Sequence, residues 1–251
     1  MIDLRQRRVA VTGGSRGIGA ACCRLFAGAG AAVLVAYGGR RGAAEELAEE
    51  LRQINPGPHD TVGGDLASPA GAEALAQAAR NLWGGLDCLV NNAGVWWRNP
   101  LGTFDVESYR RLMAVNVDGC FLAARAVLPL LERSSDGNIV NITSTAGQRG
   151  EADYSAYAAS KGAMIAATKA WSTELAPRVR VNSVAPGWVD SEMCAPAFAD
   201  GGRERIAASI PLGRVADPGD IAGPVVFLAS SLARHITGEV LNVNGGSVLA
   251  G

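Results

Sequence analysis

Residues 9–19 read VAVTGGSRGIG, a short apolar run that leads directly into a cluster of glycines. An apolar pattern with helical spacing begins at Ile18, so the stretch predicts a strand, a tight turn and a helix. Glycines allow the backbone to approach a pyrophosphate, and a helix N-terminus adds free N–H groups and positive partial charge. The spacing is G-x-x-x-G-x-G, through Gly13, Gly17 and Gly19, rather than the more familiar G-x-G-x-x-G. The stretch therefore predicts the first unit of a dinucleotide-binding fold.

The rest of the chain repeats this alternation of apolar runs and helical patterns. Strands are predicted near 8–12, 31–36, 60–64, 86–91, 137–143, 178–184 and 238–243, and helices near 17–29, 42–54, 69–83, 105–131, 154–176 and 217–231. Uninterrupted apolar runs are typical of strands that are buried on both faces of a parallel sheet. We therefore predict an α/β fold: a Rossmann-like, doubly wound, seven-stranded parallel sheet with helices on both faces.

The chain is expected to form a single dinucleotide-binding and catalytic domain over residues 1–251. Residues 187–212 contain two prolines and two adjacent glycines and no predicted strand. They follow the end of a strand, which is where ligands bind in open α/β sheets. We expect this segment to form a substrate lid.

Composition excludes several classes of function. The net charge is -1 and the isoelectric point is about 6.2, so nothing suggests binding to nucleic acid or to an anionic membrane. The charged N-terminus is expected to leave no room for a signal peptide, and no apolar run is expected to approach the roughly 18 residues of a membrane span. The five cysteines show no C-x-x-C spacing, which favours reduced thiols and a cytoplasmic protein. No metal site is predicted.

Tyr157 and Lys161 are the strongest candidates for chemistry. In a helix they lie at i and i+4, so a phenol and an ammonium project from one face. A nearby cation favours the phenolate, and we therefore expect Lys161 to lower the pKa of Tyr157. Tyr154 has no lysine at the equivalent position, because residue 158 is alanine.

With the glycine stretch, this pair resembles the short-chain dehydrogenase/reductase family, and the resemblance runs along essentially the whole chain. Further matches are Asn91-Asn92-Ala93-Gly94 after the fourth predicted strand, Asn116 in a helix, Ser144 at the family's usual distance before Tyr157, Pro186-Gly187 after the sixth strand, and the closing strand 238–243. The order and spacing of these matches identify the chain as a member of the family.

The resemblance implies a role for each matching residue. Tyr157 would donate a proton to a carbonyl oxygen, and Ser144 would hydrogen-bond the same oxygen. Lys161 would hydrogen-bond the nicotinamide ribose, and Asn116 would hold a water that links Lys161 to solvent. The implied cofactor site also includes Gly13, Ser15, Arg16, Gly17, Ile18, Gly19, Tyr37, Arg40, Asp65, Leu66, Asn92, Ala93, Gly94, Tyr157, Lys161, Pro186, Gly187, Val189 and Ser191. Asp65 is expected to bind adenine, although it equally suits capping of a turn.

The cofactor is predicted to be NADP(H), with NAD(H) as the alternative. An acid at the end of the second strand usually binds the ribose 2′-OH of NAD, but this strand ends at Ala36-Tyr37 and the next acid is Glu45. Arg16 and Arg40 carry guanidinium groups suited to a 2′-phosphate.

The substrate is predicted to be a small-molecule or acyl-thioester carbonyl compound. Trp96 and Trp97 beside the cofactor site, with Trp188 and Met193 in the lid, favour an apolar pocket. The chain resembles 3-oxoacyl-(acyl-carrier-protein) reductases, and the exposed basic residues Arg125, Arg133 and Arg178 are candidate contacts for an acidic acyl carrier protein. The resemblance also implies a homotetramer formed through the two long helices near 105–131 and 154–176 and through the C-terminal strand, with Phe121, Leu122 and Trp171 as candidate apolar contacts.

Three classes of function are compatible with these residues. An NADP-linked carbonyl reductase is favoured over a sugar or secondary-alcohol dehydrogenase that works in oxidation. A non-catalytic dinucleotide-binding sensor would be expected to have lost part of the Asn116, Ser144, Tyr157 and Lys161 set, and all four are present.

Overall fold

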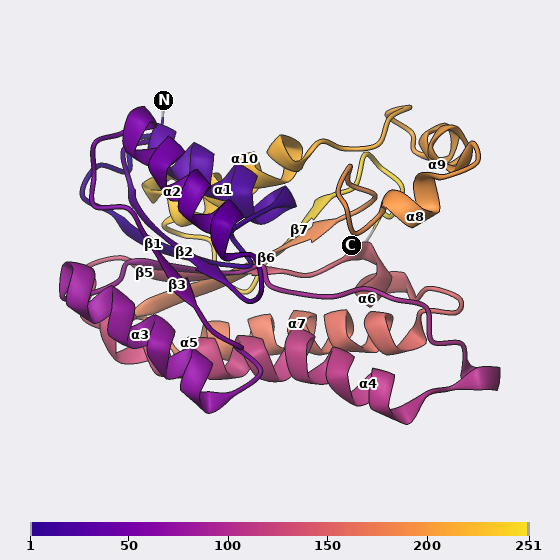
Figure 1. Cartoon of the computed structure of the whole chain (residues 1–251), viewed down its shortest axis with the longest axis horizontal. Helices are drawn as coiled ribbons and strands as arrows, with labels where there is room; N and C mark the ends of the chain where they lie inside the picture. Colours follow the sequence, from indigo (N-terminus) through magenta and orange to yellow (C-terminus); the bar gives the residue numbers. More distant parts are fainter. Residues whose placement is uncertain (1, 250–251) are drawn as a thin grey trace.

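A seven-stranded, fully parallel sheet forms the centre of the computed structural model, which describes residues 2–249 (Figure 1). The strands are β1 Arg8–Thr12, β2 Ala32–Tyr37, β3 Asp60–Gly63, β4 Cys88–Asn91, β5 Gly137–Ile142, β6 Val179–Pro186 and β7 Val240–Val243, in the spatial order β3-β2-β1-β4-β5-β6-β7. The chain adds β2 and β3 on one side of β1 and then β4 to β7 on the other side, so the direction of strand addition reverses between β1 and β4. In open α/β sheets ligands bind at such a switch point. The predicted fold class is confirmed.

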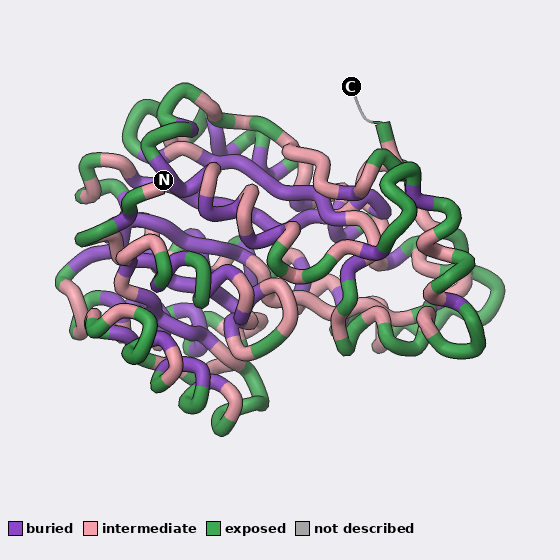
Figure 2. Tube along the Cα trace, turned by 90° about the horizontal axis from the view of Figure 1, so that it is seen from above, coloured by how far each residue is buried: buried purple, intermediate pink, exposed green. Residues whose placement is uncertain are grey.

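Helices cover both faces of the sheet, because successive strand residues point to opposite sides. In β1, Val9 and Val11 pack into one core with α1 (Gly17–Gly28), α2 (Arg41–Ile54) and α10 (Pro218–Ala229). Ala10, between them, packs into the other core with α3 (Pro69–Trp83), α5 (Gly119–Leu131) and α7 (Ser155–Glu174). Figure 2 shows the central strands as a buried layer between more exposed helices, whereas β3 and β7 at the two sides of the sheet are less buried.

Several short elements were not predicted from the sequence. They are α6 (Thr145–Arg149), two short helices in the 187–212 segment, α8 (Ala195–Phe198) and α9 (Gly202–Ser209), and 3-10 turns at Leu101–Thr103 and Ser231–Ala233. The 187–212 segment forms no strand, as expected, and Val189 in it forms an isolated bridge with Ala216, in the loop before α10. Its role as a lid remains a prediction.

The predicted helix 105–131 is continuous but irregular. It comprises α4 (Val106–Met113), a π-helical segment (Ala114–Asp118) and α5. By length and composition this helix, Val106–Leu131, could cross a membrane, and it contains an 18-residue window with a mean hydropathy of 1.5, whereas the sequence was expected to contain no apolar run of that length. Core helices of globular proteins pass the same test, and this one packs against α3 and α7. It is weak evidence for a membrane span.

Candidate active site

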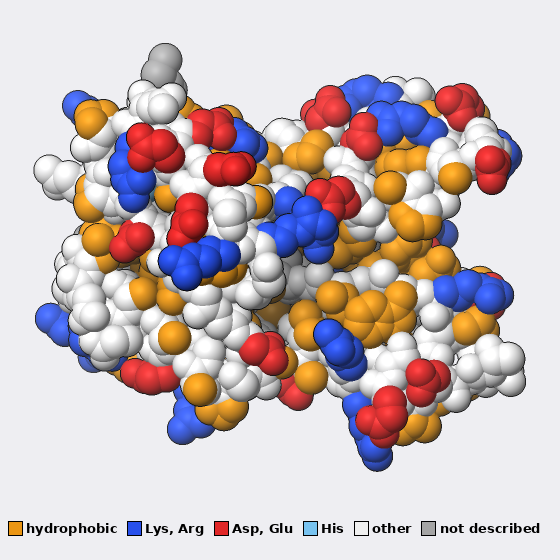
Figure 3. Space-filling model, viewed as in Figure 1, with side chains coloured by type: hydrophobic (Ala, Val, Ile, Leu, Met, Phe, Trp, Pro, Cys, Tyr) orange, Lys and Arg blue, Asp and Glu red, His pale blue; other side chains and the backbone are white. Residues whose placement is uncertain are grey.

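A cavity of about 330 Å³ opens at the carboxyl ends of the strands, next to the switch between β1 and β4. Its walls come from the glycine turn after β1, the loop after β4, the end of β5, α7 and the loop after β6. Figure 3 shows this face hollowed beside the part of the molecule that carries α8 and α9, with hydrophobic side chains gathered in the hollow. The volume falls within the range of small-molecule and cofactor sites.

The glycine turn and the Asn92–Gly94 loop are locked together. Gly13 has a φ of +60°, and a Cβ there would lie 2.9 Å from the Ala93 Cα, so only glycine fits. The Asn92 amide donates to the carbonyl oxygens of Thr12 (2.9 Å) and Gly13 (3.0 Å). The Thr12 hydroxyl accepts from the backbone N–H groups of Asn92 (2.9 Å) and Ala93 (3.0 Å). Sequence reasoning missed Thr12, because its partners lie far along the chain.

Ser144, Tyr157 and Lys161 meet at one end of the cavity, and all three line it. Ser144 caps α6 by accepting from the Ala146 N–H (3.1 Å), and it forms a side-chain hydrogen bond with Tyr157. Lys161 is only 5% exposed, and its Nζ donates to the Ile142 carbonyl (2.8 Å) at the end of β5. The same Nζ lies 5.9 Å from the centre of the Tyr157 ring. The structure therefore brings the three predicted residues together.

The pKa of Tyr157 is raised in this structure, whereas Lys161 was expected to lower it. Burial raises the pKa of Tyr157 above its ordinary value, and the hydrogen bond from Ser144 only partly opposes this shift. Burial also lowers the pKa of Lys161. Desolvation disfavours the charged form of both groups. Helical spacing revealed that the two side chains share a face but could not reveal that Lys161 is buried.

Asn116 lies in the π-helical segment and is fully buried. Its Oδ1 accepts from the Val95 N–H (2.8 Å), while its Nδ2 donates to the Val95 carbonyl (2.9 Å) and to the Ser160 hydroxyl (3.1 Å). π-Helical turns are frequent at functional sites. Asn116 thus ties the loop after Gly94 to α7, beside Lys161, whereas its predicted water-holding role is untested.

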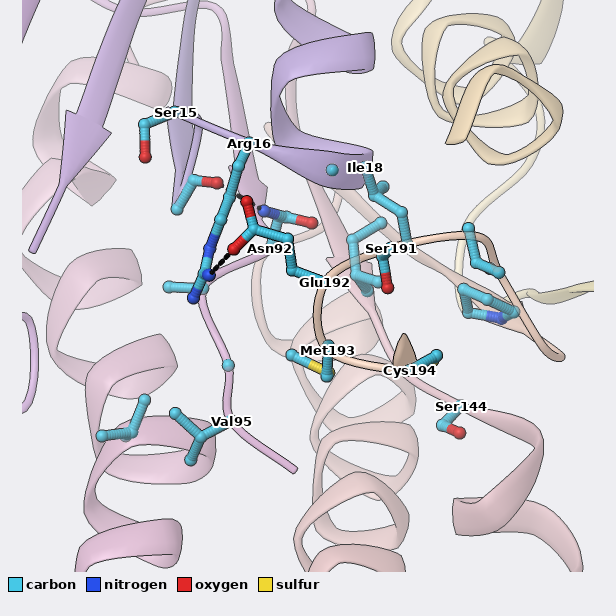
Figure 4. A pocket seen from close by; sticks show the side chains of 18 of the residues that line it. Ser15, Arg16, Ile18, Asn92, Val95, Ser144, Ser191, Glu192, Met193 and Cys194 are labelled. Carbon is cyan, nitrogen blue, oxygen red and sulfur yellow. Dashed lines mark hydrogen bonds and ion pairs between the residues drawn. The ribbon is translucent and has the colours of Figure 1, made fainter. Parts of the chain in front are cut away.

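Arg16 and Arg40 converge on one carboxylate, that of Glu192. Arg16 Nη1 lies 2.7 Å from Glu192 Oε2, and Arg40 contacts both carboxylate oxygens, at 3.0 Å and 2.7 Å. Figure 4 shows Arg16 and Glu192 pointing toward one another across the cavity. Glu192 belongs to the 187–212 segment and was not predicted as a site residue, because nothing in the sequence pairs it with arginines so distant along the chain.

The predicted cofactor residues fall into two adjoining cavities. The first is lined by Gly13, Ser15, Arg16, Gly17, Ile18, Arg40, Asn92, Ala93, Gly94, Pro186, Gly187, Val189 and Ser191, and the second by Tyr37, Asp65 and Leu66 together with Gly13, Arg16 and Ala93. Gly19 lines neither; a Cβ there would lie 2.3 Å from the Gly13 carbonyl oxygen, so it serves close packing of α1 on the turn. Asp65 accepts from the Ala67 N–H (3.0 Å) and does cap a turn.

Aromatic side chains gather on the far side of Ser144 and Tyr157. Trp96 stacks on Tyr154 with ring centres 4.4 Å apart and meets the edge of Trp188 at 6.0 Å. Trp96, Trp188 and Met193 line a smaller cavity that Ser144 and Tyr157 also line. Trp97, expected beside them, is not among its lining residues.

The same cavity holds two charged residues that were not predicted, Arg149 and Glu151. Burial raises the pKa of Glu151, and the Trp96 indole N–H donates to its carboxylate (3.5 Å). The wall is therefore aromatic but not entirely apolar.

Of the candidate carrier-protein contacts, Arg133 lies in the turn between α5 and β5, and Arg178 directly precedes β6. Both residues therefore lie near the amino-terminal ends of the strands. The cavity is at the opposite, carboxyl ends, because all strands are parallel.

Comparison with known proteins agrees with this site. A family model described as "Enoyl-(Acyl carrier protein) reductase" matches residues 13–247. A 3-oxoacyl-(acyl-carrier-protein) reductase from Vibrio cholerae is 37% identical over 98% of both chains. A 3alpha-hydroxysteroid dehydrogenase from Mediterraneibacter gnavus is 34% identical, covering 96% of this chain and 97% of the other. A crystal structure from Brucella melitensis, described as a short-chain dehydrogenase/reductase and glucose/ribitol dehydrogenase, is 33% identical with a TM-score of 0.94 and covers 99% of both chains.

Fold, site and comparisons together define a nicotinamide-dependent oxidoreductase that acts on CH–OH or C=O groups. The chain belongs to the short-chain dehydrogenase/reductase family. A dinucleotide fits the residues present: the two cavities share the glycine turn and form one extended space from Tyr37 to Tyr157.

Proposed function

We propose that this protein is an NADP(H)-dependent reductase that converts a 3-oxoacyl or related ketone into the corresponding alcohol. The observation that carries the proposal is the meeting of Ser144, Tyr157 and Lys161 at one end of a cavity whose other end is lined by Arg16 and Arg40. One end supplies a proton donor for a carbonyl oxygen, and the other supplies positive charge for a phosphate.

A bound reduced nicotinamide would supply hydride to the carbonyl carbon. The chain's own residues act on the carbonyl oxygen. The Ser144 hydroxyl donates a hydrogen bond to it where negative charge develops, and the Tyr157 phenol transfers its proton to it. Because burial raises the pKa of Tyr157, the phenol is protonated at neutral pH and ready to donate.

Lys161 and Asn116 support this proton transfer in the proposal. Lys161 hydrogen-bonds the nicotinamide ribose, and its ammonium faces the phenol as negative charge develops there. Asn116 holds the backbone of Val95 and the hydroxyl of Ser160, which keeps the loop after Gly94 against α7. In the proposal it also positions a water beside Lys161.

The preference for NADP(H) rests on charge. The cavity-lining end of β2, Tyr37 to Gly39, carries no carboxylate to hold a ribose 2′-OH or to repel a phosphate. Arg16 and Arg40 already converge on a negatively charged group. Guanidinium forks bind phosphate with charge-assisted hydrogen bonds that are about twice as strong as neutral ones.

The substrate contacts the aromatic wall in this proposal, with 187–212 as its lid. The similar reductase from Vibrio cholerae is named for a 3-oxoacyl-carrier substrate, and an acyl chain suits Trp96, Trp188 and Met193. A carrier protein remains part of the proposal only through Arg125, since Arg133 and Arg178 lie at the opposite edge. We also place the protein in the cytoplasm as a homotetramer.

Oxidation of a sugar or secondary alcohol is the second candidate. Glu151 favours it, because a half-buried carboxylate in the substrate cavity accepts hydrogen bonds from hydroxyl groups. A non-catalytic sensor is disfavoured, because Asn116, Ser144, Tyr157 and Lys161 are all present and gathered.

NADPH and NADH consumption with 3-oxoacyl thioesters, quinones, ketones and keto-sugars, measured together with NADPH and NADH formation from sugars and polyols, tests the proposal. Fastest turnover of 3-oxoacyl thioesters or ketones with NADPH supports it. Turnover confined to sugars or polyols in the oxidative direction would replace it with the second candidate.

A further inference from the structure

Glu192 occupies the point where two arginines of the cofactor cavity meet. Its carboxylate contacts Arg16 through one oxygen and Arg40 through both, at 2.7–3.0 Å. No other acidic side chain in the described part of the chain forms an ion pair with either arginine. The pKa of Glu192 is lowered by these two arginines, first through hydrogen bonds to Arg16 and Arg40. The group is therefore a carboxylate at neutral pH.

The backbone around Glu192 is held in place. Just before it, the Asp190 N–H donates to the Ala216 carbonyl (2.8 Å), and the Ala216 N–H donates to the Trp188 carbonyl (3.0 Å). Just after it, the Cys194 N–H donates to the Ser191 carbonyl (3.0 Å). This tight turn directs Glu192 across the cavity toward α1, as Figure 4 shows. The contact with the arginines thus follows from the shape of the segment and not only from a long side chain.

A carboxylate and a phosphate cannot both fill the point where these guanidinium groups converge. The three side chains are 51–56% exposed, so each ion pair is weak and can be displaced. A 2′-phosphate carries nearly two negative charges and three acceptor oxygens, and it therefore replaces Glu192, at the cost of breaking both ion pairs.

We propose that Glu192 is a specificity-determining residue, a built-in competitor that occupies the 2′-phosphate site and limits the preference of the protein for NADP(H) over NAD(H). This inference rests on the proposed NADP(H) function. It also connects cofactor choice with the lid, because Glu192 lies between Ser191 and Met193, which line the cavity. Displacing the carboxylate frees the segment from α1.

The test is isothermal titration with two probes that differ only in the phosphate, adenosine 2′,5′-bisphosphate and 5′-AMP. Glu192→Gln keeps the shape of the side chain and removes its charge. The substitution removes two exposed ion pairs that the bisphosphate otherwise has to break. The affinity of the variant for the bisphosphate should therefore be about two- to thirtyfold higher than that of the wild type. Affinity for 5′-AMP should not change. A general structural effect of the substitution would instead alter the affinity for both probes.

Glu204→Gln is the matched control. Glu204 is an exposed acid in α9 of the same segment, and it forms no ion pair with Arg16 or Arg40. The Glu204→Gln substitution removes the same charge from the segment, so it reports any long-range electrostatic effect on the affinity for the bisphosphate. Equal gains from Glu192→Gln and Glu204→Gln would overturn the proposal, because the effect would then be one of net charge.

The two proposals fail in different ways. If wild-type protein binds the bisphosphate more tightly than 5′-AMP and Glu192→Gln changes nothing, the competitor role is wrong and the NADP(H) function stands. If the wild type shows no preference and Glu192→Gln creates one, the competitor role stands and the NADP(H) preference of the native protein is wrong. If neither protein prefers the bisphosphate, both proposals are wrong.

Discussion

Replacing Tyr157 with phenylalanine removes the proposed proton donor and little else. The ring stays in place, and the lost group is the hydroxyl that hydrogen-bonds Ser144. General acid–base catalysis contributes about 10²–10⁴-fold, so turnover should fall by that factor. Loss of one neutral hydrogen bond costs about 0.5–1.5 kcal/mol of stability. In a chain of this size each kcal/mol lowers the melting temperature by about 2–4 °C, so the variant should remain folded at the assay temperature.

Tyr154→Phe is the control for this substitution. Tyr154 stacks on Trp96 and lies one helical turn before Tyr157, but it has no lysine four residues later. Turnover should be measured with the best substrate of the panel under saturating cofactor, and folding checked by thermal denaturation. A Tyr157→Phe protein that is folded and retains wild-type turnover would remove Tyr157 from the mechanism. A large loss in Tyr154→Phe would show that the assay reports the shape of the cavity instead.

Three further outcomes are expected. Burial raises the pKa of Tyr157, and below that pKa the phenolate fraction grows about tenfold per pH unit. Initial rates of alcohol oxidation should therefore rise between about pH 7 and pH 9. A flat pH profile would contradict the assignment of Tyr157. Asn116→Ala leaves the N–H and carbonyl of Val95 and the hydroxyl of Ser160 without their partner, which should lower the free energy of unfolding by about 1–3 kcal/mol in urea titrations; an unchanged midpoint would refute this. Light scattering at micromolar concentration should report a tetramer, with the 44% exposed Phe121 and its ring partner Trp171 at the contact; a monomer would sink the predicted assembly.

Local patterns were enough to predict the sheet, its main helices and the shared helix face of Tyr157 and Lys161, whereas the place of Ser144 beside them was implied by the family resemblance. Apolar runs specify buried strands, and parallel strands place the loops after Gly13, Asn91 and Ile142 at one edge. The spacing of Tyr157 and Lys161 gives their shared helix face directly. These features depend on neighbours within a few residues, or on the one fold that such neighbours permit.

The remaining features depend on contacts that the sequence does not encode locally. Glu192 lies 176 residues from Arg16 along the chain, and its loop has no periodicity to predict its direction. The raised pKa of Tyr157 is a result of burial, which spacing does not reveal. The π-helical turn at Asn116 is a one-residue change in hydrogen bonding inside a helix that was otherwise predicted in full.

The end of β2 shows that the sequence alone also failed to predict the direction of a single side chain. The sequence placed the end at Ala36-Tyr37 without showing which side chain faces the cofactor. Ala36 is 3% exposed and packs in the core with Leu34, whereas Tyr37 lines the second cavity with Arg16. A carboxylate that is meant to repel a 2′-phosphate therefore belongs at position 37, because at position 36 it would be buried.

Titration of the wild-type protein with NADPH and with NADH tests the central claim most directly, and Tyr37→Asp provides the comparison. Charge-assisted hydrogen bonds from Arg16 and Arg40 to a phosphate contribute about 1.5–3 kcal/mol each, which exceeds the roughly 0.2–1 kcal/mol of each exposed Glu192 ion pair that the phosphate displaces, so NADPH should bind at least about tenfold more tightly than NADH. Tyr37→Asp places a carboxylate in the second cavity and should reverse the order. Equal affinities in the wild type, or tighter binding of NADH, would contradict the account.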